Sequence, residues 1–398
     1  MIIVIANEGV DPRLLQLDLA GRAFGQYLSS NLRSFQAGDG SVLELDDSRQ
    51  EQLRVIRGYV EAASDLLAFQ ADVWFSKEAL ARLEELVTRE SGVPRIVREH
   101  RSAIDLGRTR DILAIYLPAG VAKQMLDRLN ADALWSGLLQ YMDILSNYAI
   151  TDSLELDCAL PPMRVVTLLD LAALERNMLY ERACKAILSG VRIRDPRQVS
   201  IRGELRCGAR VEIDLNVIIE GRVELAEDVR IGANSIIANS KIGPNTRINP
   251  FSIVEDSVIG SDSFVGPYGR IRPGSVIGSF VQIGNFVEIK NSEVGSGSRV
   301  NHLSFVGDAS LGSEVTIGAG TITCNHNGVG ISRTQIRAGA YVGSGTQLVA
   351  PILVGENATI GAGSTITRDA PAGKLTVGIV RQRTIDNWAR PIKKSPIK

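Results

Sequence analysis

A short apolar residue followed by a small one recurs along the C-terminal half of the chain, between about residues 211 and 367. An apolar position at every sixth residue fits coils of three short strands in which that position points to the axis. A sandwich of alternating strands is the alternative, but an unbroken register favours coils that stack into one apolar column. The pattern therefore predicts a parallel β-helix over residues 191–370. Its clearest run is Val342-Gly343, Leu348-Val349, Val354-Gly355, Ile360-Gly361 and Ile366-Thr367.

The pattern before residue 165 is different, because apolar runs alternate with segments of helical periodicity, as in an α/β domain. Apolar runs predict strands at residues 2–6, 72–75 and 112–116. Helical periodicity predicts helices at residues 24–35, 48–69, 76–89 and 118–148. We expect residues 1–165 to form a separate α/β domain.

A linker helix is predicted over residues 166–190. Thr167 and Asp170 have the spacing of an N-terminal cap, and Gly190 is a C-terminal stop. A helical stripe is predicted at Leu169, Ala173, Tyr180, Cys184 and Ile187. Residues 371–398 form a basic tail, for which two roles stay open: covering the last coil, or contacting the phosphates of a ligand.

Composition narrows the classes of function. The formal net charge is −1, which argues against a nucleic-acid partner. Cys158, Cys184, Cys207 and Cys324 lack the spacing of a zinc site or a disulfide framework and indicate a reducing compartment. The apolar run at residues 1–6 is too short for a signal peptide or a membrane span. We expect a cytoplasmic protein without a membrane partner.

The loop after the first predicted strand, residues 7–13, holds one glycine and two acidic residues. It has neither GxGxxG nor GxxxxGK[ST], and fixed carboxylates repel a phosphate. A structural turn is the simpler interpretation.

Two segments interrupt the hexapeptide pattern, residues 298–305 and 324–333, and they hold two of the three histidines, His302 and His326. The ordinary pKa of histidine suits proton transfer near neutrality. A surface role is the alternative for a histidine in a polar loop.

Residues 191–394 resemble the acetyltransferase half of the bifunctional bacterial enzymes that make UDP-N-acetylglucosamine. Those enzymes couple a glucosamine-1-phosphate acetyltransferase to an N-acetylglucosamine-1-phosphate uridylyltransferase. The resemblance rests on these motifs in order: Arg270-Ile271-Arg272-Pro273-Gly274, Gly284-Asn285-Phe286-Val287-Glu288-Ile289-Lys290, His302-Leu303, the run Gly318 to Asn325, and Thr346 to Pro351.

The resemblance implies roles for particular residues. His302 matches the base that takes the proton of the substrate amine, and Glu288 matches a carboxylate that supports the amine or the base. Arg272 and Lys290 match the cations that hold a sugar phosphate. The acetyl group and coenzyme A are expected at Asn325, His326, Ser344, Ala362 and Arg381. The resemblance also implies a left-handed winding, a homotrimer, acetyl-CoA as co-substrate and no metal.

Several positions depart from the family pattern. Phe305 replaces a tyrosine and Thr316 replaces a sugar-binding asparagine. His326 also replaces a tyrosine. Ile331 and Ile379 stand where the family has a lysine and an arginine, although Arg333 and Arg381 lie two positions further on. Loss of a charged donor to a phosphate costs about 1–3 kcal/mol. We therefore expect an acyl-transfer core with a rebuilt acceptor pocket.

Residues 1–165 resemble a shrunken nucleotidyltransferase domain, with Leu19-Ala20-Gly21-Arg22 in place of a LAGK-like turn. The glycine-rich loop and the metal-binding aspartate motif of that domain are missing, and Asp46 and Asp47 are weak substitutes. Uridylyl transfer needs a triphosphate cradle and carboxylate-held Mg²⁺. The sequence predicts that this activity is lost.

The favoured hypothesis is an acetyl-CoA-dependent N-acetyltransferase acting on a small amine, an amino sugar or a sugar phosphate. A non-catalytic trimeric scaffold is one alternative. A complete bifunctional enzyme with a divergent first domain is the other.

Overall fold

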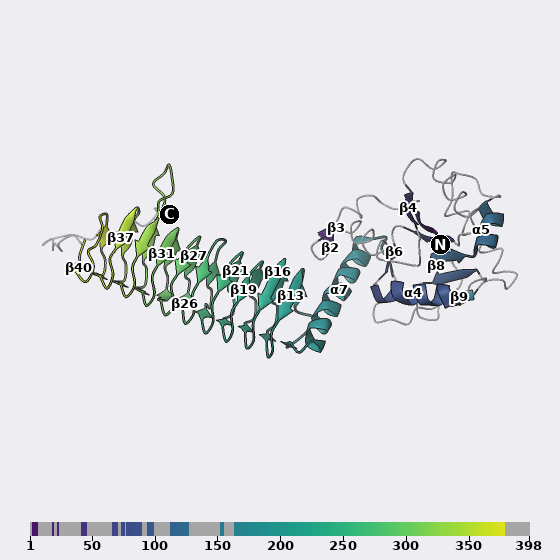
Figure 1. The fold of residues 1–398 in the computed structure, drawn as a ribbon, viewed down its shortest axis with the longest axis horizontal. Helices are drawn as coiled ribbons and strands as arrows, with labels where there is room; N and C mark the ends of the chain where they lie inside the picture. Colours follow the sequence, from purple (N-terminus) through teal and green to yellow (C-terminus); the bar gives the residue numbers. More distant parts are fainter. Residues whose placement is uncertain are drawn as a thin grey trace, which may run out of the picture. The chain divides into compact units, whose positions relative to one another are not determined.

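The computed structural model describes residues 2–6, 18–19, 22–23, 41–45, 66–70, 73–75, 77–89, 94–98, 112–126, 152–154 and 163–378. The chain divides into two compact units, Met1–Glu181 and Arg182–Lys398. Figure 1 shows the strands of the second unit stacked as a solenoid.

The first unit contains a mixed sheet in its described residues, with strand order β4-β1-β5-β8-β7-β9. The strands are β1 Ile2–Ala6, β4 Ser41–Leu45, β5 Leu66–Gln70, β7 Arg95–Arg98, β8 Ile112–Leu117 and β9 Asp152–Leu154. Two short pairs accompany it, β2 Asp18–Leu19 with β3 Arg22–Ala23, and β6 Val73–Trp74 with β10 Met163–Arg164. The helices are α4 Lys77–Arg89 and α5 Ala119–Leu126.

These elements confirm the predicted α/β character and most of the predicted positions. The predicted strands at residues 2–6, 72–75 and 112–116 correspond to β1, β6 and β8, and the helix at 76–89 corresponds to α4. The end of the helix predicted at 48–69 is wrong, because β5 occupies residues 66–70 and pairs with β1 and β8. Burial decides this: Leu66, Leu67 and Ala68 are each at most 1% exposed, so the run is inside on both faces. The helix predicted at 24–35 lies outside the described residues.

Helix α7, Leu168–Leu188, has the two predicted ends. The Thr167 backbone N–H donates to the Asp170 carboxylate at 2.8 Å, and the Asp170 N–H donates to the Thr167 hydroxyl at 3.2 Å, which is a reciprocal cap. Gly190 has a φ of 100°, as the residue after a helix often does. The predicted stripe is wrong: Leu169 is 82% exposed, and the buried positions are Leu171, Leu174, Met178 and Ala183.

The second unit is a parallel β-helix, as predicted, with three sheets within residues 182–378. Sheet 1 contains β11 Arg192–Ile193, β14 Glu212–Ile213, β17 Arg230–Ile231, β20 Arg247–Ile248, β23 Phe264–Val265, β26 Gln282–Asn285, β29 Arg299–His302, β32 Thr316–Ile317, β35 Tyr341–Val342, β38 Thr359–Ile360 and β40 Leu375–Thr376. Sheet 2 contains β12 Ser200–Ile201, β15 Ile218–Glu220, β18 Ile236–Ala238, β21 Ile253–Glu255, β24 Arg270–Ile271, β27 Glu288–Lys290, β30 Phe305–Gly307, β33 Ile322–Cys324, β36 Gln347–Val349 and β39 Thr365–Ile366. Sheet 3 contains β13 Glu204–Cys207, β16 Arg222–Leu225, β19 Lys241–Ile242, β22 Val258–Ile259, β25 Val276–Ile277, β28 Glu293–Val294, β31 Ala309–Leu311, β34 Thr334–Ile336 and β37 Ile352–Val354.

The core of the solenoid is one apolar column along its axis. On sheet 2, Ile271, Ile289 and Val306 face inward in register and are at most 1% exposed. Corner serines bind the next coil; the Ser263 hydroxyl, for example, accepts the Val281 N–H at 3.0 Å. Each coil is therefore held by its neighbours, as expected for a solenoid.

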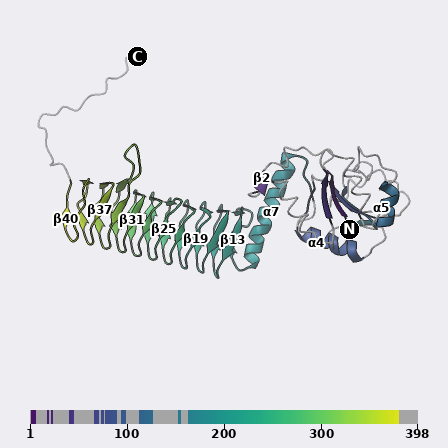
Figure 2. The same cartoon turned by 45° about the horizontal axis from the view of Figure 1, so that its top comes forward.

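One of the two predicted interruptions is real. Residues 325–333 form a loop that projects from the solenoid, visible as a hairpin-like excursion in Figures 1 and 2. Residues 298–305 do not interrupt the coils, because β29 and β30 pair normally with the strands before and after them. Val300 keeps the inward position of the repeat and is 0% exposed, while Arg299 and His302 occupy outward positions. The stack also runs past residue 370, since β40 pairs with β38.

Candidate functional site

His302 lies at the end of β29, where sheet 1 turns toward sheet 2. Its register partner on β26 is Asn285, and the His302 Nδ1 atom is 2.9 Å from the Asn285 side-chain oxygen. An amide oxygen only accepts hydrogen bonds, so in this pair Nδ1 carries the proton. The Nε2 atom then keeps its lone pair, as a proton acceptor must.

An open groove of about 430 Å³ runs past this pair. Besides His302 and Asn285, it is lined by Gly266, Pro267, Tyr268, Gln282, Gly284, Phe286 and Asn301. The rings of Phe251, Tyr268 and Phe286 stack on successive coils, with centroids 5.1 and 5.0 Å apart. The groove therefore combines an exposed imidazole with an apolar wall.

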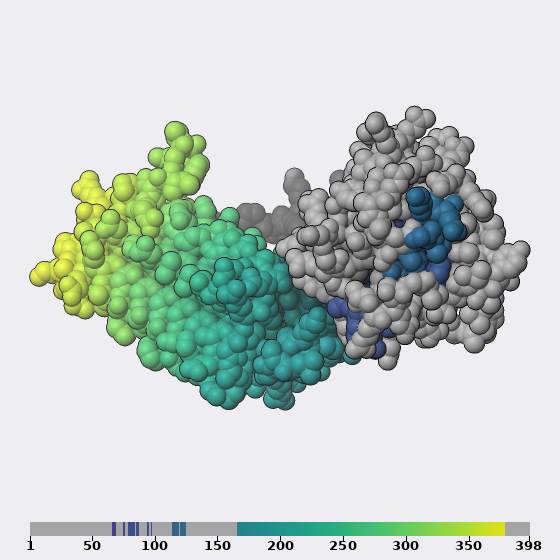
Figure 3. All heavy atoms as spheres, turned by 45° about the vertical axis from the view of Figure 1, so that its right-hand side comes forward, coloured from purple at the N-terminus to yellow at the C-terminus, as the bar shows by residue number. Residues whose placement is uncertain are grey.

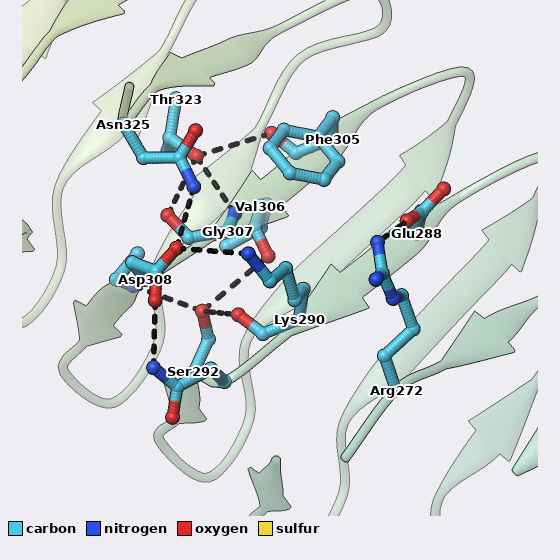
Figure 4. Close-up of polar contacts among 12 residues, drawn as sticks. Arg272, Glu288, Lys290, Ser292, Phe305, Val306, Gly307, Asp308, Thr323 and Asn325 are labelled. Atoms are coloured by element: carbon cyan, nitrogen blue, oxygen red, sulfur yellow. Dashed lines mark hydrogen bonds and ion pairs between the residues drawn. The ribbon is translucent and has the colours of Figure 1, made fainter. Parts of the chain in front are cut away.

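A second group of polar side chains lies on sheet 2. Arg272 follows β24 and donates to the Glu288 carboxylate on β27 at 2.7 Å (Figure 4). About a third of each side chain is exposed, at 36% and 33%, so both remain accessible to solvent. Glu288 is therefore paired with the Arg272 guanidinium group, whereas His302 is paired with Asn285.

Asp308 connects Lys290 to Asn325. Its side chain is only 5% exposed and lies 3.6 Å from the Lys290 ammonium group. The side-chain amides of Asn291 and Asn325 donate to its two oxygens at 2.6 and 2.5 Å. Burial alone would raise the pKa of Asp308, but the hydrogen bonds from Asn291 and Asn325 and the charge of Lys290 outweigh it, and the pKa is lowered. Figure 4 shows the carboxylate at the centre of this network.

Phe305 on β30 packs beside the same network. A methyl group added at Gly307 would lie 2.4 Å from the Phe305 Cζ atom, so the ring covers the space that Gly307 leaves open. Phe305 is the register neighbour of Glu288. The ring therefore forms an apolar boundary next to the Arg272–Glu288 pair.

The projecting loop holds His326. Its Nδ1 atom accepts the Gly328 N–H at 3.1 Å, and it bridges to Ile331 across the base of the loop. The loop carries exposed apolar side chains, with Val329 96% exposed and Ile331 58% exposed. In Figure 3 this loop stands out from the surface as a knob of yellow-green spheres. Arg333 does not point to the tip, because its guanidinium group is 3.4 Å from the Ala309 carbonyl oxygen on sheet 3.

The remaining predicted residues lie further along the solenoid. Thr316 faces outward on β32 between Arg299 and Tyr341. Ser344 and Ala362 are exposed at the same corner of successive coils. Arg381 lies outside the described residues.

Two site residues were missed, namely Asn285 as the partner of His302 and Asp308 as the connector. The sequence contained a signal for both. Asn285 precedes His302, and Asp308 precedes Asn325, by 17 residues, which is one coil of this solenoid. Residues one coil apart lie side by side, so this spacing predicts contact.

Among the described residues, no group of three or more His, Cys, Asp or Glu side chains is arranged to hold a metal ion. None of the described helices is long and apolar enough to cross a membrane.

Comparison with known proteins links the chain to hexapeptide enzymes. Residues 201–305 match the model of the GMPPB C-terminal domain, and residues 333–368 match the bacterial transferase hexapeptide (six repeats). Among solved structures, the polySia-specific acetyltransferase NeuO is 19% identical, with a TM-score of 0.21, over 50% of this chain and 91% of that chain.

Curated relatives extend over both units. The bifunctional protein GlmU of Aromatoleum aromaticum is 45% identical over 76% of this chain and 68% of its own length. The GlmU protein of Bordetella petrii is 40% identical over 80% of this chain and 73% of its own length. Identity at this level over most of both chains confirms the resemblance and the assignment to the N-acetyltransferase enzymes. The chain belongs to the family of the bifunctional GlmU proteins.

Proposed function

We propose that this protein transfers the acetyl group of acetyl-CoA to the amine of an amino sugar or a related small molecule, with His302 as the general base. The observation that carries the proposal is the pairing of an exposed His302 with Asn285 in an open groove. The pairing leaves Nε2 free on a ring that is held in one orientation.

The chemistry follows from that tautomer. The amine nitrogen attacks the thioester carbonyl carbon, and its proton passes to His302 Nε2. The C–S bond then breaks, and the coenzyme A thiolate leaves and takes up a proton. The Nδ1–H bond to Asn285 exists in both protonation states of the ring, so the ring does not turn during the cycle. Base catalysis of this kind contributes about 10²- to 10⁴-fold in rate.

The acceptor is proposed to bind along sheet 2. Arg272 and Lys290 carry donors beyond those used on Glu288 and Asp308, and such donors suit a phosphate or a ring hydroxyl. Phe305 offers an apolar face at this place and no hydroxyl. This supports an amino-sugar acceptor whose contacts differ from those of glucosamine-1-phosphate in the family, with Thr316 on sheet 1 as a further contact.

Acetyl-CoA is proposed to lie along the projecting loop and the corner formed by Ser344 and Ala362, near Asn325, His326 and Arg381. A homotrimer would bring the groove of one chain to the corner of the next. The free thiols of Cys184, Cys207 and Cys324 agree with a cytoplasmic location. We further propose that the chain lacks uridylyltransferase activity.

The test is release of coenzyme A thiol from acetyl-CoA with a panel of amino sugars, with and without phosphate. His302→Ala is expected to lower kcat by about 10²-fold or more at unchanged acetyl-CoA affinity. Glu293→Ala, an exposed change on sheet 3, is the control. Equal rates in His302→Ala and the wild type would remove His302 from the mechanism. Absence of both turnover and acetyl-CoA binding in the wild type would favour a non-catalytic scaffold.

A further inference from the structure

Four arginines surround a hollow at the start of sheet 1, away from the candidate acyl-transfer site. Arg192, Arg230 and Arg247 face outward on β11, β17 and β20, and Arg194 follows β11. The hollow has a volume of about 250 Å³. Its lining also includes two carboxylates, Glu212 and Asp214, and therefore has more positive than negative side chains.

The carboxylates are shared unequally among these arginines. Arg194 lies 3.0 Å from Asp214, and Arg192 lies 3.5 Å from Glu212. Arg230 reaches the same Glu212 carboxylate only at 3.9 Å. Glu212 and Asp214 therefore neutralise mainly the charges of Arg192 and Arg194.

Arg247 has no carboxylate within ion-pair distance in the part of the chain that the structure describes. Its guanidinium carbon lies 5.8 Å from the centre of the Phe264 ring, and its register neighbour on the other side is Arg230. Like charges directly opposite each other on neighbouring strands are destabilising. In a purely structural charge ladder an acidic residue would separate the two, as Glu212 separates Arg192 from Arg230.

Gly232 lines the hollow, in line with Asp214 and Asn249 on the neighbouring coils. A methyl group at Gly232 would come within 2.7 Å of the Pro250 nitrogen, so the next coil closes tightly behind it. On this side the hollow is lined by the Gly232 backbone, Asn249 and Pro250. The hollow therefore combines open space, an excess of positive charge and an Arg247 side chain without an acidic partner among the described residues.

We propose that this hollow binds the phosphate group of a small anionic molecule, held between Arg230 and Arg247. Guanidinium groups recognise phosphate oxygens through paired N–H donors. The volume is below that of pockets for drug-sized ligands, which span about 300–1,000 Å³. It suits one or two phosphate groups, with any organic part of the ligand lying outside.

The test is isothermal titration calorimetry on the full chain with inorganic phosphate, pyrophosphate and a sugar phosphate monoester, at constant ionic strength. Arg247→Gln is expected to weaken binding about tenfold or more, since hydrogen bonds to charged groups are lost. Arg222→Gln is the control, because it removes an equal charge from sheet 3, outside the lining of the hollow. Lys290→Gln separates this hollow from the acceptor region. Tighter binding of the monoester than of free phosphate would identify an organic phosphate as the ligand.

Thermal unfolding gives a second readout. Without added anion, Arg247→Gln is expected to leave the Tm unchanged or raise it, because the repulsion from Arg230 is removed. The increase in Tm that pyrophosphate gives to the wild type is expected to be absent in this variant. Binding that survives Arg247→Gln but is lost in Lys290→Gln would overturn the proposal. So would no binding to the wild type, or a Tm that falls in the variant without any dependence on anion.

Discussion

His302 is paired with the side-chain amide of Asn285, and a neutral partner affects proton transfer differently from a carboxylate. A carboxylate at Nδ1 would stabilise the charged ring and favour proton retention, whereas the neutral Asn285 oxygen orients the ring without adding charge. A base that must return its proton to solvent in each cycle benefits from the neutral partner. Glu288, an acid of the proposed site, is bound to Arg272.

Asp308 gives the site a pH-sensitive contact. Asp308→Asn removes the charge beside Lys290 and turns an acceptor for Asn291 or Asn325 into a donor. The free energy of unfolding at neutral pH is expected to fall by about 1–3 kcal/mol. The control is Asp256→Asn, because Asp256 has a similar backbone conformation, with φ of 43° against 49°, but an exposed side chain.

The pH dependence of this loss has a definite sign. The pKa of Asp308 is lowered in the folded chain relative to the ordinary value of 3.8, so the folded state binds its proton less readily than the unfolded state does. The stabilisation is therefore complete above that ordinary value and disappears as the pH falls through the lower folded pKa. Denaturant titrations of both proteins between pH 7 and 3 should show the difference narrowing below about pH 4. A difference that widens toward acid would contradict this assignment.

At the scale of the strand, stability comes from the inward position of each hexapeptide. Ile289 on β27 is 0% exposed and Ile322 on β33 is 41% exposed, although both are isoleucines on sheet 2. Ile289→Ala is expected to cost about 2–5 kcal/mol, because a cavity opens in the apolar column. Ile322→Ala should cost well under half of that, since its side chain is already partly in water. Urea unfolding measures both, and equal losses would show that β27 has no buried face.

The coils of the solenoid are the part of the fold that could best be predicted from the sequence. The six-residue period predicted the coils because buried Ile and Val positions alternate with small corner residues. The period cannot separate a true insertion from a polar coil: the break predicted at residues 298–305 is absent, whereas the break predicted at residues 324–333 corresponds to the projecting loop at residues 325–333. The buried face of helix α7 could not be predicted from its periodicity. Leu169 and Leu188 are apolar but exposed, so they hide the stripe of buried positions, Leu171, Leu174 and Met178. In the candidate site, a motif was enough to propose His302 as the base, whereas the contacts of Asn285 and Asp308 follow only from the register of neighbouring coils.

At the scale of the whole molecule, two units of different character share one chain. The second unit carries every described residue of the proposed acyl-transfer site and the arginine-lined hollow. The first unit has a mixed sheet in which β1 lies between β4 and β5. Its sequence lacks the glycine-rich loop after β1 that a triphosphate requires, and residues 7–13 carry Glu8 and Asp11 instead. The two units therefore can be tested for activity separately in the intact protein.

The first unit is predicted to have no nucleotidyl-transfer activity. Purified protein given UTP, Mg²⁺ and N-acetylglucosamine-1-phosphate should release no pyrophosphate above the uncatalysed rate, because residues 7–13 lack a glycine-rich phosphate-binding motif and include two acidic residues, whose charge disfavours a triphosphate. Thiol release from acetyl-CoA by the same preparation shows that the protein is active. Pyrophosphate release that persists in His302→Ala would place a working nucleotidyl-transfer site in the first unit, and the chain would then be a complete bifunctional enzyme. No pyrophosphate release together with acetyl transfer would mean that the two activities of the family have been separated in this chain, with only the solenoid's chemistry retained.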